Sequence, residues 1–369
     1  MQSAASLGIS PARPSLSLYA EFKNKKDICQ SYEGDQMQQP YLLFLGNGDN
    51  PGDAKTGAGI AHWRADICLG QYRMESCSID LGLKDTGIDE AVELGVKTLV
   101  VGVAPDGGKI CQTWVPTILE ALDKGLDVAA GLHERLSDIP EVYRMAKSKG
   151  RTIYDVRQPD QTFSVGSGVK RSGMRLLTVG TDCAVGKMYA SLALEREMHQ
   201  RGMKVDFRAT GQTGIFIAGQ GVSIDAVVSD FVSGASESLS PANDQDHWDV
   251  IEGQGSLFHP SYAAVTLGLI HGSQPDKIVL CHEAGRSHIQ YIKGYPIPDL
   301  SACLEAHTTM ARLTNPAAAT IGLCVNTSSL SEEQALEYLQ ETEKSLGIPC
   351  CDPVRTGVSR IVDVLQNSA

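Results

Sequence analysis

Short apolar runs alternate with longer amphipathic stretches along most of this chain. From residue 41 to residue 156, apolar runs of about 4–8 residues are separated by stretches with helical periodicity, and the same alternation restarts at residue 175. This pattern is typical of parallel β-sheets that helices cover on both faces. It predicts an α/β fold with two parallel-sheet domains. The first is Rossmann-like, although no Gly-x-Gly-x-x-Gly follows its first strand.

The apolar runs and the periodic stretches predict where the elements lie. In the first half the predicted strands are Tyr41–Leu45, Thr98–Val103, Asp127–Ala130 and Thr152–Val156, and the predicted helices are Ile88–Gly95, Trp114–Lys124 and Ile139–Ser148. In the second half the predicted strands are Arg175–Val179, Lys204–Ala209, Val250–Glu252, Lys277–Cys281 and Ala319–Val325, and the predicted helices are Gly186–Arg201, Tyr262–His271, Leu300–Leu313 and Ser331–Leu346. Two of these helices carry N-cap signals, Asp299 or Ser301 for one and a capping box of Ser331 with Gln334 for the other.

This organisation divides the chain into three segments. Residues 1–39 are polar and are expected to form an N-terminal extension, residues 40–165 the Rossmann-like domain, and residues 166–369 the second α/β domain. The polar, glycine-rich stretch 157–173 is typical of a linker or of a crossing beside an active site. Because ligands of such sheets bind at the carboxyl ends of the strands, the segments that follow strands are the candidates for chemistry.

One such segment is Gly180-Thr-Asp-Cys-Ala-Val-Gly-Lys187, which lies between an apolar run and a helical pattern. Strand, glycine-rich turn, lysine and helix are the layout of a phosphate-binding loop, in which backbone N–H groups and the lysine surround an anion. The loop has five residues between its glycines and resembles that of dethiobiotin synthetase; a turn that binds nothing is the alternative. The second domain is therefore expected to be P-loop NTPase-like, with these cofactor-binding residues: Gly180, Thr181, Asp182, Cys183, Ala184, Val185, Gly186, Lys187 and Met188.

Met188 stands where nucleotide hydrolases carry the Ser or Thr that ligates magnesium. A thioether is a poor ligand for a hard cation that prefers oxygen. We therefore expect a cofactor that is held rather than hydrolysed, and no metal requirement. Coenzyme A, with its pyrophosphate and 3′-phosphate, is a ligand of this kind.

Charge and length narrow the classes of partner. The 369 residues favour two domains, and the net charge of −12 argues against binding nucleic acid or an anionic membrane through a general positive field. The chain shows neither a signal-peptide pattern nor an apolar run of membrane-spanning length. We expect a soluble, cytoplasmic protein that acts on a small molecule. A homo-oligomer is also expected, with the number of subunits left open.

The ten cysteines are scattered without a Cys-x-x-Cys pair, which disfavours a zinc site. Cys183 differs from the rest because it lies in the phosphate loop, where a helix N-terminus lowers the pKa of a thiol. A packing role in the loop is expected, and a catalytic thiol is the alternative.

Candidate acid–base residues follow the strands of the second half. Glu252 directly follows an apolar strand, where it either ligates a metal, acts as a general base or only pairs with a backbone amide. Asp230, in the segment Ile224–Phe231, and His259, on the turn after Glu252, are the other catalytic candidates, with solvated or structural positions as the alternatives.

Polar side chains near these turns are the candidates for substrate binding. Arg286 follows the strand Lys277–Cys281 and either clamps a substrate carboxylate or forms a surface salt bridge. In the first domain, Lys55–Arg64 is predicted to be a basic, glycine-containing loop that either binds substrate or lies on a solvated surface. The further substrate-binding candidates are Arg208, Gln212, Gln254 and Tyr262.

Taken together, these segments resemble one bacterial P-loop family, long described as a domain of unknown function and often mislabelled as a nucleotide-sugar epimerase. The resemblance spans roughly residues 41–365 and includes the Met after the loop lysine. The phrases that carry it are Ala104–Gly108, Gly125–His133, Gly180–Met188, Thr210–Ile215, Ile224–Phe231, Glu252–Ser256 and His282–Arg286.

The family resemblance implies an N-acetyltransferase that transfers acetyl from acetyl-CoA to the amino group of D-glutamate, as the first step of its catabolism. Spacing alone supports only a P-loop protein that is not a standard hydrolase. Two alternatives therefore stay open: an ATP- and magnesium-dependent synthetase resembling dethiobiotin synthetase, and a non-catalytic nucleotide-binding regulator. The general base, the stereochemical preference and any part for ATP are left undetermined by the residues.

Overall fold

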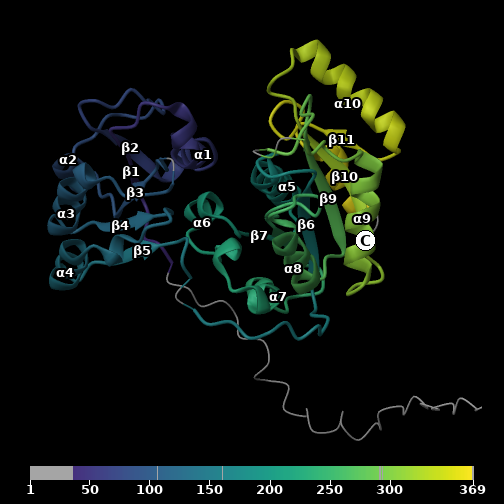
Figure 1. Cartoon of the computed structure of the whole chain (residues 1–369), viewed down its shortest axis with the longest axis horizontal. Helices are drawn as coiled ribbons and strands as arrows, with labels where there is room; N and C mark the ends of the chain where they lie inside the picture. The colour runs from purple at the N-terminus through teal and green to yellow at the C-terminus, as the bar shows by residue number, and fades with distance from the viewer. Residues whose placement is uncertain (1–35, 106, 160, 291, 293, 368–369) are drawn as a thin grey trace, which may run out of the picture.

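The computed structural model describes residues 36–367 except 106, 160, 291 and 293, and this part of the chain forms two α/β domains side by side (Figure 1). The first has a parallel sheet of strand order β2-β1-β3-β4-β5, and the second a parallel sheet of order β11-β10-β9-β6-β8-β7. The predicted class of two parallel-sheet α/β domains is confirmed. No helix among the described residues is long and apolar enough to cross a membrane.

The first domain contains two elements that the sequence pattern did not predict. Its strands are β1 (Tyr41–Gly46), β2 (Cys68–Arg73), β3 (Thr98–Val101), β4 (Asp127–Ala130) and β5 (Ile153–Asp155), and its α-helices are α1 (Lys55–Trp63), α2 (Ile88–Glu93), α3 (Val115–Asp123) and α4 (Pro140–Lys149). The edge strand β2 was missed. The expected basic loop Lys55–Arg64 was wrong, because Lys55–Trp63 is helix α1.

The glycines of α1 explain this error. A Cβ on Gly57 would lie 3.0 Å from the carbonyl oxygen of Gly102. A Cβ on Gly59 would lie 2.8 Å from Cγ2 of Thr213 in the second domain. Both glycines therefore allow close helix packing, which their sequence neighbourhood cannot distinguish from a flexible turn.

The second domain adds several helices to the predicted set. Its strands are β6 (Met174–Gly180), β7 (Val205–Arg208), β8 (Trp248–Ile251), β9 (Lys277–Glu283), β10 (Ala319–Asn326) and β11 (Cys350–Cys351), and its α-helices are α5 (Lys187–Gln200), α6 (Gln212–Ala218), α7 (Val232–Leu239), α8 (Ala263–Ser273), α9 (Leu300–Arg312), α10 (Glu332–Leu346) and α11 (Ser359–Asn367). The unpredicted elements are α6, α7, α11 and β11. Both capping predictions are confirmed: Asp299 accepts the N–H groups of Ser301 and Ala302, and Ser331 forms a capping box with Gln334.

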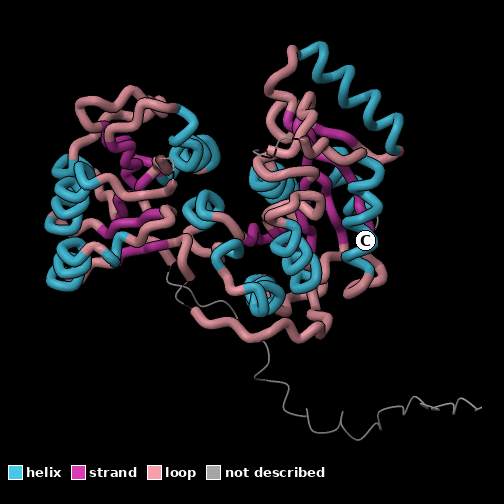
Figure 2. Tube along the Cα trace, viewed as in Figure 1, coloured by secondary structure: helices cyan, strands magenta, loops and turns pink. Residues whose placement is uncertain are grey.

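The two domains share a packed contact rather than only a tether. Between β5 and β6 the described residues form no helix or strand (Figure 2). In addition to this connection, the ring of Tyr189 on α5 stacks on His62 of α1, with centroids 5.6 Å apart, and meets the Trp63 ring edge-on at 5.5 Å. The Tyr41 hydroxyl donates to the carbonyl of Phe216 on α6 at 3.2 Å. Helix α1 therefore fixes the first domain against the helix that follows the phosphate loop.

Candidate active site

The phosphate loop connects β6, in the interior of the second sheet, to the first turn of α5. Ala184 and Gly186 adopt positive φ values of 51° and 95°, which turn the backbone toward the helix. Gly180 is needed at the start of the loop because a Cβ there would lie 2.8 Å from the Asp182 carbonyl oxygen. The loop geometry therefore depends on its two glycines, as the sequence spacing predicts.

Lys187 is buried in the first turn of α5, and its Nζ donates to the carbonyl of Asp182 at 2.8 Å. Burial lowers the pKa of this ammonium, opposed by Glu252 and other nearby groups. The lysine side chain thus lies against its own loop, and its buried ammonium group is where a phosphate-binding loop requires a positive charge.

Arg286 braces this loop from the next strand. Its guanidinium donates to Asp182 Oδ2 at 2.8 Å and to the Cys183 carbonyl at 2.8 Å, and it also pairs with Glu283. The Asp182 carboxylate is fully buried and accepts a further hydrogen bond from the backbone N–H of Gln290 at 2.7 Å. The structure therefore gives Arg286 a carboxylate of the protein itself as its partner, in place of the substrate carboxylate that we expected.

Glu252 lies directly after β8, next to the loop. One carboxylate oxygen accepts the backbone N–H groups of Thr210 and Gly211 at 2.9 and 3.1 Å, and Gln254 donates to the other oxygen at 3.3 Å. Burial raises the pKa of Glu252 to about 7, with the two backbone hydrogen bonds and Lys187 acting in the opposite direction. The backbone-amide pairing left open by the sequence is therefore present, and it holds a carboxyl group that titrates near neutrality.

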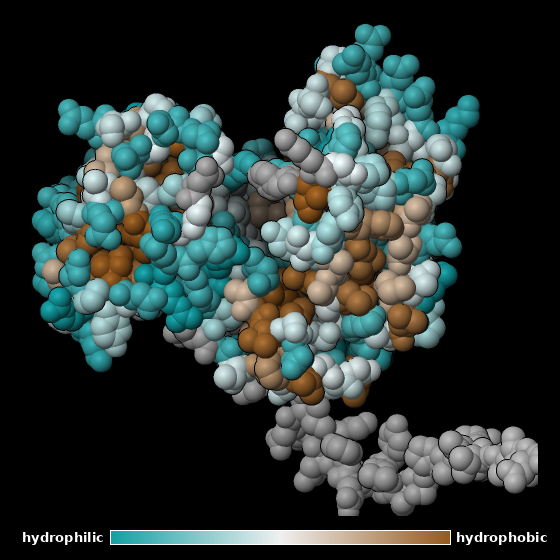
Figure 3. All heavy atoms as spheres, in the orientation of Figure 1, coloured by the Kyte–Doolittle hydropathy of each residue, from teal (hydrophilic) through white to brown (hydrophobic). Residues whose placement is uncertain are grey.

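A cavity of about 750 Å³ joins these groups. It lies between the domains, where Figure 3 shows the surface hollowed. The first domain contributes Lys55 and Ala58 to it, and the second domain contributes the loop from Cys183 to Tyr189, Thr213, Glu252–Gly255, and residues at the ends of β10 and β11. This location agrees with the rule that ligands bind at the carboxyl ends of parallel strands.

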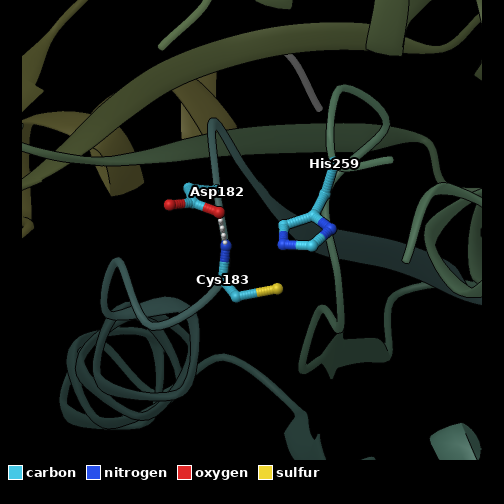
Figure 4. Close-up of side chains that lie close together, drawn as sticks. All are labelled: Asp182, Cys183 and His259. Atoms are coloured by element: carbon cyan, nitrogen blue, oxygen red, sulfur yellow. Dashed lines mark hydrogen bonds between the residues drawn. The ribbon is translucent and has the colours of Figure 1, made fainter. Parts of the chain in front are cut away.

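His259 faces the phosphate loop from the turn after β8 (Figure 4). A carboxylate oxygen of Asp182, the sulfur of Cys183 and a ring nitrogen of His259 all lie within 4.8 Å of one another. His259 Nδ1 accepts the backbone N–H of Ser261 at 3.1 Å, so the proton of the neutral ring is on Nε2. His259 is therefore set as a hydrogen-bond donor at Nε2.

Of the predicted catalytic and substrate-binding residues, Glu252 and Gln254 line the cavity, and these do not: Asp230, His259, Arg208, Gln212, Tyr262 and Arg286. Asp230 lies exposed in the 3₁₀ turn Ser229–Phe231. Arg208 donates to Asp249 at 2.7 Å and to Asp206 at 3.0 Å. Gln212 lies in the domain contact, where a Cβ on Gly131 would lie 2.7 Å from its Oε1.

Two more candidates lie nearer the site. Gln254 lines the cavity beside Glu252. Tyr262 is 50% exposed, and its ring packs against His259 with centroids 4.5 Å apart. Gln254 therefore keeps a position from which substrate can be reached, whereas Tyr262 lies outside the cavity lining.

Sequence reasoning missed the part of the cavity at β10 and β11. Asn326, Ser328 and the segment Asp352–Arg355 line it, and Asp352 is buried and accepts the backbone N–H groups of Thr327, Val354 and Arg355. Asn326 directly follows the predicted strand Ala319–Val325, so the strand-end rule would have found it. The two-residue strand β11 left no comparable pattern around Asp352.

A Rossmann-like parallel-sheet domain, packed against a second domain whose phosphate loop and strand-end carboxylate share one cavity, defines a two-domain P-loop protein. The comparisons with known proteins agree with this class. The chain belongs to the family whose models are described as the Rossmann-like and P-loop domains of the domain of unknown function DUF1611, matched over residues 70–159 and 163–362.

Solved and curated relatives agree with this membership. A crystal structure of a DUF1611 family protein from Anabaena variabilis is similar with a TM-score of 0.80 and 33% identity, covering 89% of this chain and 100% of that one. A D-glutamate N-acetyltransferase from Tritonibacter scottomollicae is 48% identical, covering 89% of this chain and 99% of the relative. Another with the same name, from a Pseudoalteromonas species, is 46% identical, covering 89% and 98%. The predicted family resemblance is confirmed.

Proposed function

We propose that this protein transfers the acetyl group of acetyl-CoA to the amino group of D-glutamate. The observation that carries the proposal is that Lys187, which can hold phosphate, and Glu252, whose carboxyl group titrates near pH 7, line one cavity. The name D-glutamate N-acetyltransferase on two relatives that are 48% and 46% identical supports the choice of acceptor and of the acetyl group that is transferred.

The phosphate loop would hold the pyrophosphate of the donor. Backbone N–H groups at the N-terminus of α5 and the ammonium of Lys187 offer positive partners there. From the loop the cavity extends to Asn326 and Asp352–Arg355, whose polar groups would receive the adenosine end. The pantetheine arm would then run toward the opposite wall, where Glu252 and Gln254 lie.

Glu252 is proposed as the general base, with Asp230 and His259 set aside. As a carboxylate it would accept one proton from the ammonium of the acceptor, which frees the amine lone pair to attack the thioester carbon. The new N–C bond forms, the C–S bond breaks, and the coenzyme A thiolate leaves and takes the second proton that the attacking nitrogen loses. His259 is a poor base because its Nε2 already carries the proton, whereas Asp230 is exposed outside the cavity lining.

Charge that develops on the thioester oxygen needs donors in the same cavity. The backbone N–H groups of Gln254 and Gly255 and the side-chain amide of Gln254 are the candidates, because the Gly253 N–H already donates to Thr178 Oγ1 at 3.0 Å. Gly253 lets this turn pack tightly against β6, because a Cβ there would lie 1.8 Å from the Thr178 carbonyl oxygen.

The donor set around the loop supports a mechanism without a metal. Met188 provides a thioether, and the nearby hydroxyls have protein partners: Ser191 lies 2.9 Å from Thr178 Oγ1, and Thr181 lies 3.1 Å from His282 Nδ1. Thioester aminolysis also has no transferring phosphoryl group whose charge a metal would neutralise.

Thiol release from acetyl-CoA, measured against a panel of D- and L-amino acids with and without ATP and magnesium, tests the proposal. Acetyl-CoA-dependent thiol release with D-glutamate, accompanied by N-acetyl-D-glutamate in the mass spectrum, is the expected result. Release of ADP in place of thiol would favour a synthetase. Nucleotide binding with no turnover of any donor would favour a regulator.

A further inference from the structure

We propose that Lys55, from helix α1 of the first domain, binds a carboxylate of the acceptor and makes the enzyme selective for acidic amino acids. This inference rests on the proposed function and deepens it, because neither the family description nor the relatives' names assign a substrate-binding residue. With this role, the Rossmann-like domain contributes a substrate-binding side chain to a cavity that residues of the P-loop domain mostly line.

An acidic acceptor needs a cation because its surroundings are negative. The chain carries a net charge of −12, and Glu252 adds a carboxylate to the cavity wall where the amine must arrive. The net negative charge of the protein and the Glu252 carboxylate both repel a substrate with two carboxylates, unless a positive group lies within a few ångströms of that substrate.

Most of the candidate cations already have protein partners. Arg286 pairs with Asp182 and Glu283, and Arg208 pairs with Asp249 and Asp206. Arg355 lines the far end of the cavity and donates to the carbonyl groups of Thr327 and Leu330. Lys187 belongs to the phosphate loop.

Lys55 also lines the cavity, and its ammonium group is available to a ligand. Its side chain is exposed, and within residues 36–367 as described no hydrogen bond or ion pair engages it. It lies in the first turn of α1, where the helix dipole disfavours a positive charge, so helix stability does not explain a lysine there.

The packing of α1 also places Lys55 in the lining of the same cavity as the proposed base. Next to it, the hydroxyl of Thr56 accepts a hydrogen bond from Thr213 at 3.3 Å, and Thr213 lines the cavity too. Thr213 belongs to α6, whose preceding residues Thr210 and Gly211 donate to Glu252. The carboxylate-binding lysine and the base are therefore held on one continuous structure, which orients an amino acid with its amine toward Glu252.

Steady-state thiol release by Lys55→Ala, Lys55→Arg and a control, Lys97→Ala, tests this inference. Lys97 is likewise exposed on the first domain but does not line the cavity. We expect Lys55→Ala to raise the KM for D-glutamate about tenfold while the KM for acetyl-CoA changes less than about twofold. Lys55→Arg should recover most of the loss, and Lys97→Ala should match the parent protein.

Calorimetric binding of D-glutamate to the same proteins separates this inference from the reaction. If the parent turns over D-glutamate and Lys55→Ala keeps its KM, the role of Lys55 is wrong while the proposed function stands. If the parent releases no thiol but binds D-glutamate, and Lys55→Ala weakens that binding about tenfold, the carboxylate site stands and the reaction is wrong. Equal binding by the parent and Lys55→Ala overturns the site in either case.

Discussion

Cε of Met188 lies 3.6 Å from the position that a Cβ on Gly59 would occupy. The residue that replaces the usual magnesium ligand of a phosphate loop therefore faces helix α1 of the other domain. The next residue, Tyr189, stacks on His62 of the same helix. The first turn of α5 thus both ends the phosphate loop and packs against the Rossmann-like domain.

This arrangement predicts that activity does not require a divalent cation. We expect acetyl transfer to D-glutamate to continue at the parent rate in excess EDTA, because Met188 points to a packing contact and the reaction transfers no phosphoryl group. The thiol-release assay measures this directly. Loss of transfer on chelation, restored by magnesium, would instead indicate the synthetase chemistry.

Lys187→Ala is predicted to weaken acetyl-CoA binding far more than D-glutamate binding. A charge-assisted contact contributes about 1.5–3 kcal/mol, which corresponds to an increase in Kd of about 10- to 150-fold. Isothermal calorimetry with each ligand measures the two effects. Lys344→Ala, on α10 outside the cavity lining, is the control and should bind as the parent does. An unchanged acetyl-CoA affinity in Lys187→Ala would refute the phosphate assignment.

Local patterns were sufficient to predict where the glycine-rich loop and Glu252 lie in the fold, at the cavity. The local backbone geometry of the loop requires the spacing of Gly180, Gly186 and Lys187, so this spacing can be recognised in the sequence alone. Glu252 was found because the carboxyl end of an apolar strand is a general position for ligand-binding groups. Its hydrogen bonds come from Thr210 and Gly211, which lie 42 and 41 positions away, so the near-neutral pKa that they modify was not predictable from sequence.

The errors arose where a residue's partner lies far along the chain. Arg286 follows a strand as a substrate-binding residue would, but its partner is Asp182, 104 positions away. Gly57 and Gly59 suggested a loop because glycine disfavours helices, whereas they are needed where α1 contacts Gly102 and Thr213. Single-sequence patterns carry propensity and periodicity, and these cases were decided by tertiary contacts that neither property encodes.

Cys183→Ser is predicted to keep most of the turnover, with no acetyl-enzyme formed. Burial raises the pKa of the Cys183 thiol, with Lys187 acting in the opposite direction, so the thiol lacks the low pKa of a nucleophilic cysteine. Mass spectrometry after acetyl-CoA alone checks this. A trapped acetyl group on Cys183 with ping-pong kinetics would contradict direct transfer.

The pH dependence of the reaction is predicted to report Glu252. The raised pKa of about 7 keeps this carboxyl group neutral, and unable to accept a proton, in mildly acidic solution. The rate at saturating substrate should therefore fall about tenfold per pH unit below about pH 7 and level off above it. Glu252→Gln should lose this dependence together with at least about 99% of the activity. A full rate in Glu252→Gln would assign the base to another group.

The free energy of unfolding provides a second measurement of the Glu252 pKa. It should decrease as the pH rises, whereas the rate should increase. Because the folded-state pKa of Glu252 lies above the unfolded value of 4.5, its contribution to the free energy of unfolding is fully present below about pH 4.5 and is lost as the pH rises through about 7. Glu252→Gln removes this ionisation and keeps an oxygen that can accept the Thr210 and Gly211 N–H groups. The melting temperature of Glu252→Gln relative to the parent should therefore rise between pH 5 and pH 8, while its activity stays low. A constant difference across this range would mean that Glu252 ionises with an ordinary pKa, and a carboxylate of that kind would be a weaker base at neutral pH.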